Sequence, residues 1–351
     1  MAQFHTLKVK SIVRQTEKAV SVTFDIPTNL EPEFAFKAGQ YITLKAIINK
    51  SEIRRDYSLS SSPKSGNLTV TIKEIEGGLF SAYANKNLKV GDNLKVGMPS
   101  GRFIYDPQTA NENSIVAFAA GSGITPIMSI ARTVLETNDG ADFVLIYGNK
   151  SPEKTIFYKE LLDLQSQHSE RFKIQFVYSE SDEEGALFGR IDTGAVNYIL
   201  KNTIQLESSP LFYLCGPEGM IKTTTAILSE KGVHDKRILF ELFTASSAVP
   251  TSSGVVREGE SEITMLVDEE ETTLVMPRNQ TILEAALAND VDAPYSCQGG
   301  VCSSCICRVT EGSASMRQNN ILTDNEVAEG LVLSCQAEPT SSTIKVDFDD
   351  I

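Results

Sequence analysis

Short stretches in which hydrophobic and polar residues alternate dominate the first 106 residues of the chain. A period of two places one face of a strand in a core and the other face in solvent. Turn-forming residues separate the stretches, as at residues 64–67 and 90–93. Strands are expected at residues 6–13, 20–26, 41–47, 55–60, 68–75 and 93–96. With one brief helix near residues 79–85, this pattern predicts a small closed antiparallel β-barrel.

The pattern changes at about Asn113, where continuous apolar runs begin to alternate with amphipathic helical periods. Residues 114–120 form the first such run, which is typical of a strand buried on both faces. Further strands are expected at residues 143–147, 173–178, 211–214 and 237–243. Helices are expected from Pro126 and at residues 153–167, 193–200 and 217–231. Repeated strand–helix alternation predicts an α/β domain with a parallel sheet, over residues 107–243.

Residues 244–260 are rich in Ser, Thr, Gly and Pro and show neither period, which predicts a linker. The remaining segment, residues 261–351, predicts an α+β domain built from a hairpin, one helix and returning strands. Its strands are expected at residues 262–267, 272–276, 306–310, 331–337 and 343–348, with a turn at 268–271 and a helix at 281–289.

Charge is unevenly distributed along the chain. The net charge of the 351 residues is −14, and residues 261–351 carry sixteen acidic and four basic side chains, that is 4 − 16 = −12. An acidic domain disfavours nucleic acid and suits docking onto a basic partner, although solubility alone would also explain the charge. No apolar run approaches the length of a membrane span, and residues 1–10 lack the apolar core of a signal peptide. These features favour a cytoplasmic protein.

Four of the six cysteines have the spacing C-x4-C-x2-C followed by a distant cysteine: Cys297, Cys302, Cys305 and Cys335. This is the plant-type spacing for a 2Fe–2S cluster, because four thiolates must converge on two irons and a tight loop supplies three of them. Gly299 and Gly300 let the backbone approach the inorganic sulfides. Structural thiols or a zinc site are the alternatives, but zinc sites usually show two matched C-x2-C pairs. Cys307 is expected to pack rather than to ligate.

Two motifs in the predicted barrel have the chemistry of a cofactor site. Arg55-Asp56-Tyr57-Ser58 places a cation and a phenol on one face of a strand, followed by a hydroxyl. Gly77-Gly78-Leu79-Phe80-Ser81 places glycines and a hydroxyl at a helix start, where anions bind. Each motif alone is also compatible with an ordinary surface pattern.

Three motifs in the predicted α/β domain stand at strand ends. Gly121-Ser-Gly-Ile-Thr-Pro126 joins the first apolar run to a helix, and such a strand–loop–helix unit cradles phosphate. It differs from the dinucleotide fingerprint G-x-G-x-x-G and is a weak signal by itself. Cys215-Gly216-Pro217 lies at the carboxyl edge of the sheet, where such sheets bind ligands, and Glu241-Leu242-Phe243 ends the domain.

Together and in this order, the motifs resemble the ferredoxin–NADP reductase superfamily across nearly the whole chain, with a C-terminal plant-type 2Fe–2S ferredoxin domain of β-grasp fold. The resemblance implies that the barrel binds FAD, with FMN as a variant. Tyr57 would lie against the flavin ring, and Ser58 would donate a hydrogen bond near its N5. The flavin pyrophosphate would be held by Arg55, Gly77, Gly78 and Ser81.

The same resemblance implies that the pyridine nucleotide lies along Gly121, Gly123, Thr125, Pro126, Gly216 and Pro217. Thr125 and Cys215 would sit near the nicotinamide–flavin contact. Glu241 would lie close to that contact, and Phe243 would shield the flavin ring. The implied catalytic set is therefore Tyr57, Ser58, Thr125, Cys215 and Glu241. Taken alone, Cys215 is also compatible with a buried small hydrophobic residue, and that alternative stays open.

The choice between NADPH and NADH depends on residues that follow the second and third strands of the α/β domain. Lys150 and Lys154 follow the second strand and Ser179 follows the third, so cations and a hydroxyl are available for a 2′-phosphate. Glu180 stands beside Ser179, where a carboxylate would repel that phosphate. The balance favours NADPH, with NADH as the alternative donor.

The implied function is electron transfer from NADPH through FAD and the 2Fe–2S cluster to an oxygenase. Nicotinamide gives up two electrons as a hydride and the cluster accepts one at a time, so a flavin must stand between them. The stretches Ile75–Gly78, Tyr147–Asn149 and Leu333–Ala337 resemble in particular the reductase components of di-iron phenylacetyl-CoA epoxidases. Alternatives are a reductase of a Rieske oxygenase or another hydroxylase, a non-catalytic iron–sulfur redox sensor, and a flavin-only oxidase.

Overall fold

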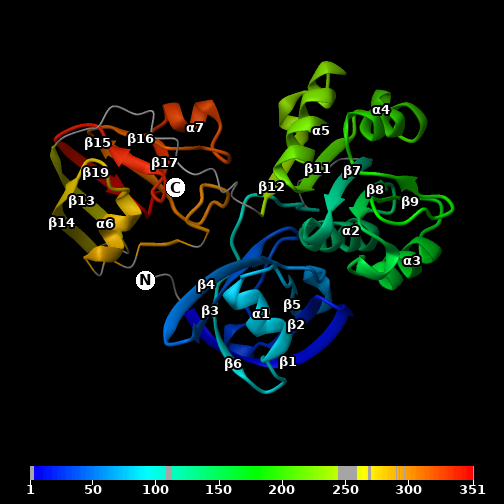
Figure 1. Cartoon of the computed structure of the whole chain (residues 1–351), viewed down its shortest axis with the longest axis horizontal. Coiled ribbons are helices and arrows are strands. Elements are labelled where there is room, and N and C mark those ends of the chain that lie inside the picture. The colour runs from blue at the N-terminus through cyan, green and yellow to red at the C-terminus, as the bar shows by residue number, and fades with distance from the viewer. Residues whose placement is uncertain are drawn as a thin grey trace. The chain divides into compact units, whose positions relative to one another are not determined.

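The computed structural model describes residues 4–107, 113–243, 259–267, 270–289, 291, 293–295 and 297–350. These residues fall into two units, of which the first is Phe4–Phe243 and the second lies C-terminal to it. The first unit contains an antiparallel barrel and a parallel sheet, and the second contains a mixed sheet (Figure 1). Most of the predicted linker, residues 244–258, lies outside the described residues.

Six antiparallel strands form the barrel in the order β4-β3-β6-β1-β2-β5. The sheet closes through Leu59, directly after β4, which forms a bridge with Val70 of β5. A single helix, α1, packs against β2, β3, β4 and β5. The elements are β1 (Phe4–Thr16), β2 (Ala19–Asp25), β3 (Tyr41–Ile48), β4 (Ser51–Ser58), β5 (Leu68–Lys73), α1 (Leu79–Lys86) and β6 (Asn93–Gly97).

The β3–β4 hairpin is longer than the sequence pattern predicts. The expected strand 55–60 begins instead at Ser51, and β3 and β4 pair from Tyr41–Ser58 to Ile48–Ser51. Asn49 and Lys50 form the two-residue turn with φ of 53° and 68°. Positive φ at both central positions matches the twist of a hairpin, but it usually calls for glycine. Without a glycine, the turn gave no signal in the sequence.

The second domain is a six-stranded parallel sheet in the order β10-β9-β8-β7-β11-β12. Helices α2 and α3 cover one face, and α4 and α5 cover the other (Figure 1). The strands are β7 (Ser114–Ala120), β8 (Asp142–Asn149), β9 (Phe172–Tyr178), β10 (Leu187–Phe188), β11 (Leu211–Gly216) and β12 (Ile238–Leu242). The helices are α2 (Ile124–Thr137), α3 (Tyr158–Gln167), α4 (Thr193–Asn202) and α5 (Glu218–Glu230).

One helix boundary in this domain differs from the expected one. The predicted helix 153–167 begins at Tyr158, because Pro152–Lys154 form a separate 3-10 turn and Phe157 has a φ of 61°. A left-handed residue cannot continue a right-handed helix. The short strand β10 was not predicted, because two residues are too few to show a period.

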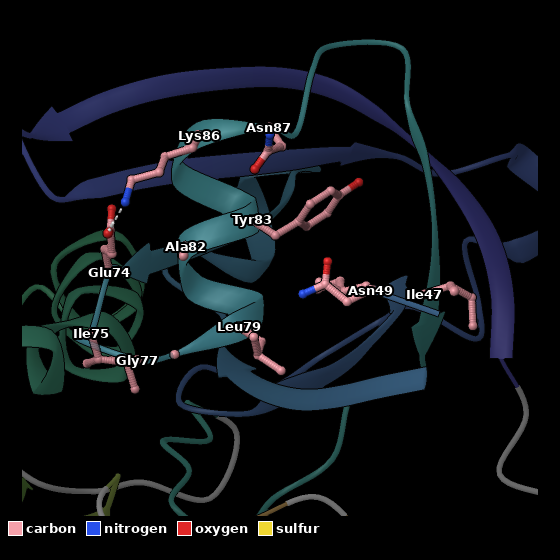
Figure 2. Close-up of a pocket in the computed structure, with 12 residues that line it drawn as sticks. Ile47, Asn49, Glu74, Ile75, Gly77, Leu79, Ala82, Tyr83, Lys86 and Asn87 are labelled. Carbon is pink, nitrogen blue, oxygen red and sulfur yellow. Dashed lines mark hydrogen bonds and ion pairs between the residues drawn. The ribbon is translucent and has the colours of Figure 1, made fainter. Parts of the chain in front are cut away.

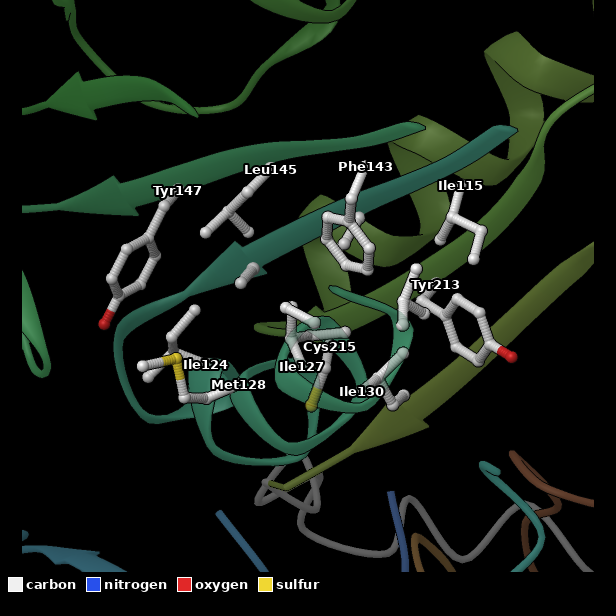
Figure 3. Close-up of a cluster of buried hydrophobic side chains, with 14 of the residues drawn as sticks. Ile115, Ile124, Ile127, Met128, Ile130, Phe143, Leu145, Tyr147, Tyr213 and Cys215 are labelled. Carbon is white, nitrogen blue, oxygen red and sulfur yellow. The ribbon is translucent and has the colours of Figure 1, made fainter. Parts of the chain in front are cut away.

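Helix α2 packs its apolar face on the parallel sheet. Ile127, Met128 and Ile130 of α2 lie in one buried cluster with Phe143 and Leu145 of β8 (Figure 3). The continuous apolar run of β7 is buried on both faces, as expected for a central parallel strand. This packing holds the start of α2 at the carboxyl edge of the sheet.

The C-terminal unit has a five-stranded mixed sheet in the order β14-β13-β19-β15-β17, with the separate pair β16-β18. Its elements are β13 (Glu260–Val267), β14 (Glu270–Pro277), α6 (Ile282–Ala288), β15 (Ile306–Glu311), β16 (Ala314–Met316), α7 (Asp324–Ala328), β17 (Leu331–Leu333), β18 (Ala337–Pro339) and β19 (Thr343–Asp347). The predicted strand 331–337 is wrong, because the chain turns between β17 and β18, at Cys335. The predicted fold class of each of the three domains is confirmed.

Candidate functional site

The end of β4 presents the predicted flavin-contacting residues. Tyr57 packs against Phe80 of α1, with 5.5 Å between the ring centroids. Burial raises the pKa of Tyr57, and the nearby Arg55 guanidinium opposes that shift. Ser58 is 4% exposed and follows Tyr57 at the last position of the strand. The side chain of Arg55 donates to the backbone carbonyl of Arg54.

The loop before α1 is shaped by its two glycines. Gly77 has a φ of 74°, which glycine adopts without strain. A Cβ on Gly78 would lie 2.5 Å from Ser81 Oγ and 2.6 Å from Ile75 Cγ1, so a larger residue would displace one of these side chains. Ser81 Oγ accepts a hydrogen bond from the Ile75 backbone N–H at 3.2 Å. Ser81 therefore holds the loop, and α1 begins without a side-chain cap, which leaves N–H groups for an anion.

A pocket of about 620 Å³ opens between α1 and the β3–β4 hairpin (Figure 2). Three of its lining residues are large hydrophobic side chains that are unusually exposed, namely Ile47 (68%), Ile75 (60%) and Leu79 (46%). Tyr83 projects toward the same space, and Gly77 and Gly78 also line the pocket. A pocket with exposed apolar side chains next to the predicted phosphate-binding loop is compatible with a nucleotide site.

The Gly121 turn leads from β7 into α2 at the carboxyl edge of the parallel sheet. Gly121 has a φ of 56°, and its carbonyl accepts a hydrogen bond from Tyr147 Oη at 2.9 Å. A Cβ on Gly123 would lie 2.0 Å from the carbonyl oxygen of Cys215, so the turn contacts the end of β11 directly. Thr125 Oγ1 donates to the Ser122 carbonyl at 3.1 Å, and Pro126 lies in the first turn of α2.

Three predicted residues meet where the barrel faces the parallel sheet. Ser58 Oγ donates to Glu241 Oε2 at 3.2 Å, which joins β4 to β12. Cys215 is the register partner of Glu241 in the β11–β12 pair. Burial raises the pKa of Glu241 to about 8, and burial and the nearby Glu241 also raise the pKa of Cys215. At neutral pH this site therefore favours a protonated carboxyl and a thiol.

Cys215 is fully buried in the apolar cluster that includes Ile124 and Ile127 (Figure 3). This burial agrees with the packing alternative, so a contact between its sulfur and a nicotinamide stays a prediction. Gly216 follows at the strand end, where a Cβ would lie 2.9 Å from Met220 and 3.2 Å from Ala120. Pro217 then precedes α5. Phe243 is 37% exposed, and its shielding role also stays a prediction.

The residues expected to choose between the nucleotides form one charged cluster. Lys150 Nζ and Lys154 Nζ lie 2.6 and 3.0 Å from the two carboxylate oxygens of Glu180. These contacts lower the pKa of Glu180. Ser179 donates its backbone N–H to the Asn149 carbonyl at 3.0 Å, which places Ser179 beside the end of β8.

Lys73 is a cation that the sequence motifs did not reveal. It ends β5 of the barrel, and its Nζ lies 3.2 Å from the position that a Cβ on Gly121 would take. Burial and the positive charge of Lys150 lower the pKa of Lys73. Lys73 thus brings a barrel cation to the Gly121 turn, the predicted phosphate-binding turn. Only a long-range contact places it there, so the local sequence carried no signal.

Four thiols converge in the C-terminal unit as two pairs. Cys302 Sγ lies 3.2 Å from Cys297 Sγ, and Cys305 Sγ lies 3.3 Å from Cys335 Sγ. Thiol contacts from Cys302 and Cys335, with the backbone N–H groups of Gly299 and Val301, lower the pKa of Cys297. Two cysteine sulfur pairs beside backbone N–H donors fit a 2Fe–2S cluster, in which each iron takes two protein sulfurs.

The cluster loop is supported by two glutamines that the sequence motifs did not reveal. Gln318 Nε2 donates to the Gly299 carbonyl at 2.6 Å, and Gln336 Nε2 donates to the Gln298 carbonyl at 3.1 Å. Gln298 and Gly300 adopt φ of 53° and 68°, which turns the loop around the sulfurs. Cys307 is fully buried in the core of this unit, which confirms that it packs.

Three family models match the chain in the order of its domains. The oxidoreductase FAD-binding domain matches residues 6–105, the oxidoreductase NAD-binding domain matches residues 118–226, and the 2Fe-2S iron-sulfur cluster binding domain matches residues 265–340. None of the helices in the described part of the chain is long and apolar enough to cross a membrane.

Full-length relatives have the same organisation. The chain is 37% identical over 352 residues to one component of the 1,2-phenylacetyl-CoA epoxidase of Escherichia coli, with 99% of each chain covered. The chain belongs to the family of FAD- and 2Fe–2S-containing oxygenase reductases. It is also 31% identical to the ferredoxin reductase component of 3-ketosteroid-9-alpha-monooxygenase from Rhodococcus rhodochrous, covering 97% of this chain and 96% of that one. It is therefore an NAD(P)H-dependent oxidoreductase.

Two solved structures have the same fold as this chain. Phthalate dioxygenase reductase, described as a modular structure for electron transfer from pyridine nucleotides to [2Fe-2S], superposes with a TM-score of 0.62 at 24% identity, covering 98% of each chain. An intact type IV self-sufficient cytochrome P450 monooxygenase superposes with a TM-score of 0.70 at 22% identity, covering 98% of this chain and 41% of that chain. The fold of the oxygenase reductase thus also occurs within a longer monooxygenase chain.

Proposed function

We propose that this reductase takes electrons from NADPH and delivers them to a phenylacetyl-CoA epoxidase. The observation that carries the proposal is the 37% identity to the Escherichia coli epoxidase component over 99% of both chains. A second candidate acceptor is a steroid monooxygenase, because the ketosteroid monooxygenase reductase is also full-length and 31% identical. Both candidates share the same internal electron route and differ only in the terminal partner.

The protein groups described above would bind and orient the cofactors. When bound, the flavin accepts a hydride from the nicotinamide and passes single electrons to the 2Fe–2S cluster. Tyr57 would pack against the flavin ring, while Ser58 donates its hydroxyl proton to Glu241 at the barrel–sheet contact. The Gly121 turn would hold the pyridine nucleotide with its backbone. The thiol pairs of the C-terminal unit would ligate the two irons.

The pocket beside α1 supports FAD rather than FMN as the flavin. FMN ends at one phosphate, whereas FAD continues into a second phosphate and an adenosine. The exposed side chains of Ile47, Ile75 and Leu79 offer an apolar surface next to the Gly77–Gly78 loop. An adenosine placed there would cover these side chains, which otherwise remain exposed to water.

The charged cluster after β8 and β9 supports NADPH. Lys150 and Lys154 face the single carboxylate of Glu180, and Lys73 adds a further cation beside Lys150. The excess of positive charge would attract a 2′-phosphate, while Glu180 would compete with that phosphate for both lysines.

The acidic C-terminal domain would dock on the oxygenase in the cytoplasm. Its charge of −12 over residues 261–351 contrasts with −2 for the remaining residues, that is −14 − (−12) = −2. Complementary charge raises association rates and makes them sensitive to salt. Electron delivery is therefore expected to slow as ionic strength rises.

Reconstitution with purified oxygenases tests the choice of acceptor. The reductase and NADPH are mixed with the remaining components of a phenylacetyl-CoA epoxidase, and separately with a ketosteroid monooxygenase oxygenase. Coupled product formation with the epoxidase only is the expected result. Product with the ketosteroid oxygenase only would contradict the proposal, while reduction of artificial dyes checks that the reductase itself is active.

A further inference from the structure

One helix connects the barrel to the phosphate-binding turn of the parallel sheet. Helix α2 begins directly after the Gly121 turn, and three of its side chains reach the barrel. Ser129 Oγ donates to the Ser61 carbonyl at 2.7 Å, and Arg132 Nη1 donates to the Ser60 carbonyl at 3.0 Å. Residues spaced three apart lie on one face of a helix, so these contacts form a single row.

The barrel segment held by this row is the continuation of the flavin strand. Ser60 and Ser61 follow Tyr57 and Ser58, with only Leu59 between them. Ser62 extends the contact by donating to the Glu136 carboxylate, one turn further along α2. The same rigid helix thus starts at the predicted nicotinamide site and clamps the backbone that carries the predicted flavin contacts.

Arg132 also belongs to a closed ring of polar contacts that crosses the barrel–sheet interface twice. Its guanidinium pairs with Glu160 of α3, and Glu160 accepts a hydrogen bond from Gln15 of β1 at 3.1 Å. From Gln15 the ring returns to Arg132 through these contacts: Gln15 Nε2 to Ser21 Oγ (3.0 Å), Ser21 Oγ to Thr71 Oγ1 (2.8 Å), Thr71 Oγ1 to Ser60 Oγ (3.1 Å), and the Ser60 carbonyl to Arg132.

The ring is buried where it passes through the barrel. Ser60 is 1% exposed, Thr71 is 3% exposed and Ser21 is 6% exposed. Apolar contacts are non-directional and would let two domains slide over each other. The hydrogen bonds of the ring are directional, and a shift would leave its buried donors or acceptors in the barrel unpaired, while the Arg132 and Glu160 side chains are 24% and 41% exposed.

We propose that Arg132 is a positioning residue that sets the alignment of the nicotinamide with the flavin. The inference rests on the proposed hydride route from NADPH to the flavin. Hydride transfer needs the reacting atoms about 3–3.5 Å apart, and a displacement of about 1 Å caused by a distant mutation can cost about 100-fold in rate. Arg132 contacts neither reacting group, and it acts through the relative placement of Ser58 and the Gly121 turn.

The test replaces Arg132 by methionine, which keeps an unbranched apolar stem close to that of arginine and removes the guanidinium hydrogen bonds. Arg132→Met is expected to lower the stopped-flow rate of flavin reduction by NADPH by about 10-fold to 100-fold, normalised to flavin content. It should also increase the primary isotope effect with 4-deuterated NADPH and leave the nucleotide Kd about unchanged. Hydrogen exchange of the peptide covering residues 58–65 should quicken in the full-length protein. Arg132→Lys, which can still reach the Ser60 carbonyl, should recover part of the rate.

Arg171 provides a matched control, because its side chain binds the other end of α2. Its guanidinium donates to the Leu135 and Asn138 carbonyls at 2.7 and 2.8 Å, within the parallel-sheet domain and away from the barrel. Arg171→Met therefore removes similar contacts from α2 without touching the interface. Arg171→Met should reduce its flavin at the wild-type rate, and hydrogen exchange of the peptide 58–65 should also match the wild type.

Equal rates for Arg132→Met and the wild type, or equal losses in Arg132→Met and Arg171→Met, would overturn the inference. If Arg132→Met does not fold, Ser129→Ala decides: a slower reduction with faster 58–65 exchange supports the inference, and wild-type values for both overturn it. Failure of the proposed function is a distinct outcome, because the wild type itself would then show no flavin reduction by NADPH.

Discussion

At the scale of single residues, the cysteine set makes the sharpest prediction. Cys302→Ser removes one member of the Cys297–Cys302 pair, so cluster absorbance and the reduced 2Fe–2S EPR signal should fall at least about 10-fold. NADPH-driven dye reduction should persist, because the hydride route lies in the other unit. Cys307→Ala changes a buried cysteine of the same domain and should keep the cluster. Loss of the cluster in both variants, or loss of dye reduction in Cys302→Ser, would contradict the assignment.

Glu241 predicts a specific dependence of stability on pH. Its pKa in the folded protein is about 8, above the value of about 4.3 expected for unfolded glutamate. Between these values the folded state binds more protons than the unfolded state, so the free energy of unfolding falls as pH rises through this window. Glu241→Gln should flatten that fall between about pH 5 and 8, measured as Tm against pH. If the Tm of Glu241→Gln falls with pH as steeply as that of the wild type, a group other than Glu241 causes the pH dependence.

Candidate site residues could be predicted where they belong to a local motif with a characteristic spacing. The four cysteines, the two glycine turns and Ser58 were found from local motifs, and the structure places Ser58 against Glu241. Lys73, Gln318 and Gln336 were missed because their partners lie far away in sequence. The burial of Cys215 likewise depends on helix α2 packing over it, which no local pattern reports.

At the scale of elements, the nucleotide preference is predicted to depend on the ends of β8 and β9. Glu180→Arg would release Lys150 and Lys154 and add a cation beside the expected 2′-phosphate. The ratio of kcat/KM for NADPH over NADH should rise by about 10-fold, since one charge-assisted contact is worth about 1.4 kcal/mol. Glu183→Arg makes the same charge change in the same loop, at a residue that contacts Ser181 instead. Equal shifts in both variants would indicate a general field effect rather than this cluster.

Strand and helix types followed from hydrophobic period, whereas several boundaries did not. The β3–β4 turn uses Asn49 and Lys50 at positive φ, and α3 is delayed by Phe157, also at positive φ. These local conformations are imposed by the surrounding fold and have no glycine to reveal them. Helix α7 was not predicted, although Thr323 and Glu326 form a capping box that is visible in the sequence.

At the scale of the whole molecule, the three domains supply every step of the electron route, although the FAD-binding domain precedes the NAD-binding domain along the chain. The route needs a site for the hydride donor, a hydride acceptor and a one-electron carrier. The chain provides these as a nucleotide-binding sheet, a flavin-type barrel and a four-thiol domain. The barrel and the parallel sheet form one unit, Phe4–Phe243, while the cluster domain is a separate unit. The electron must therefore cross from one unit to the other.

An anaerobic titration of the purified protein with NADPH, and separately with NADH, tests that route most directly. Visible absorbance follows the flavin and EPR follows the cluster. The account predicts that the flavin bleaches, that a reduced 2Fe–2S signal then appears, and that NADPH is the faster donor. Bleaching with no cluster signal would contradict the electron route to Cys297, Cys302, Cys305 and Cys335, and no bleaching with either nucleotide would contradict the reductase itself.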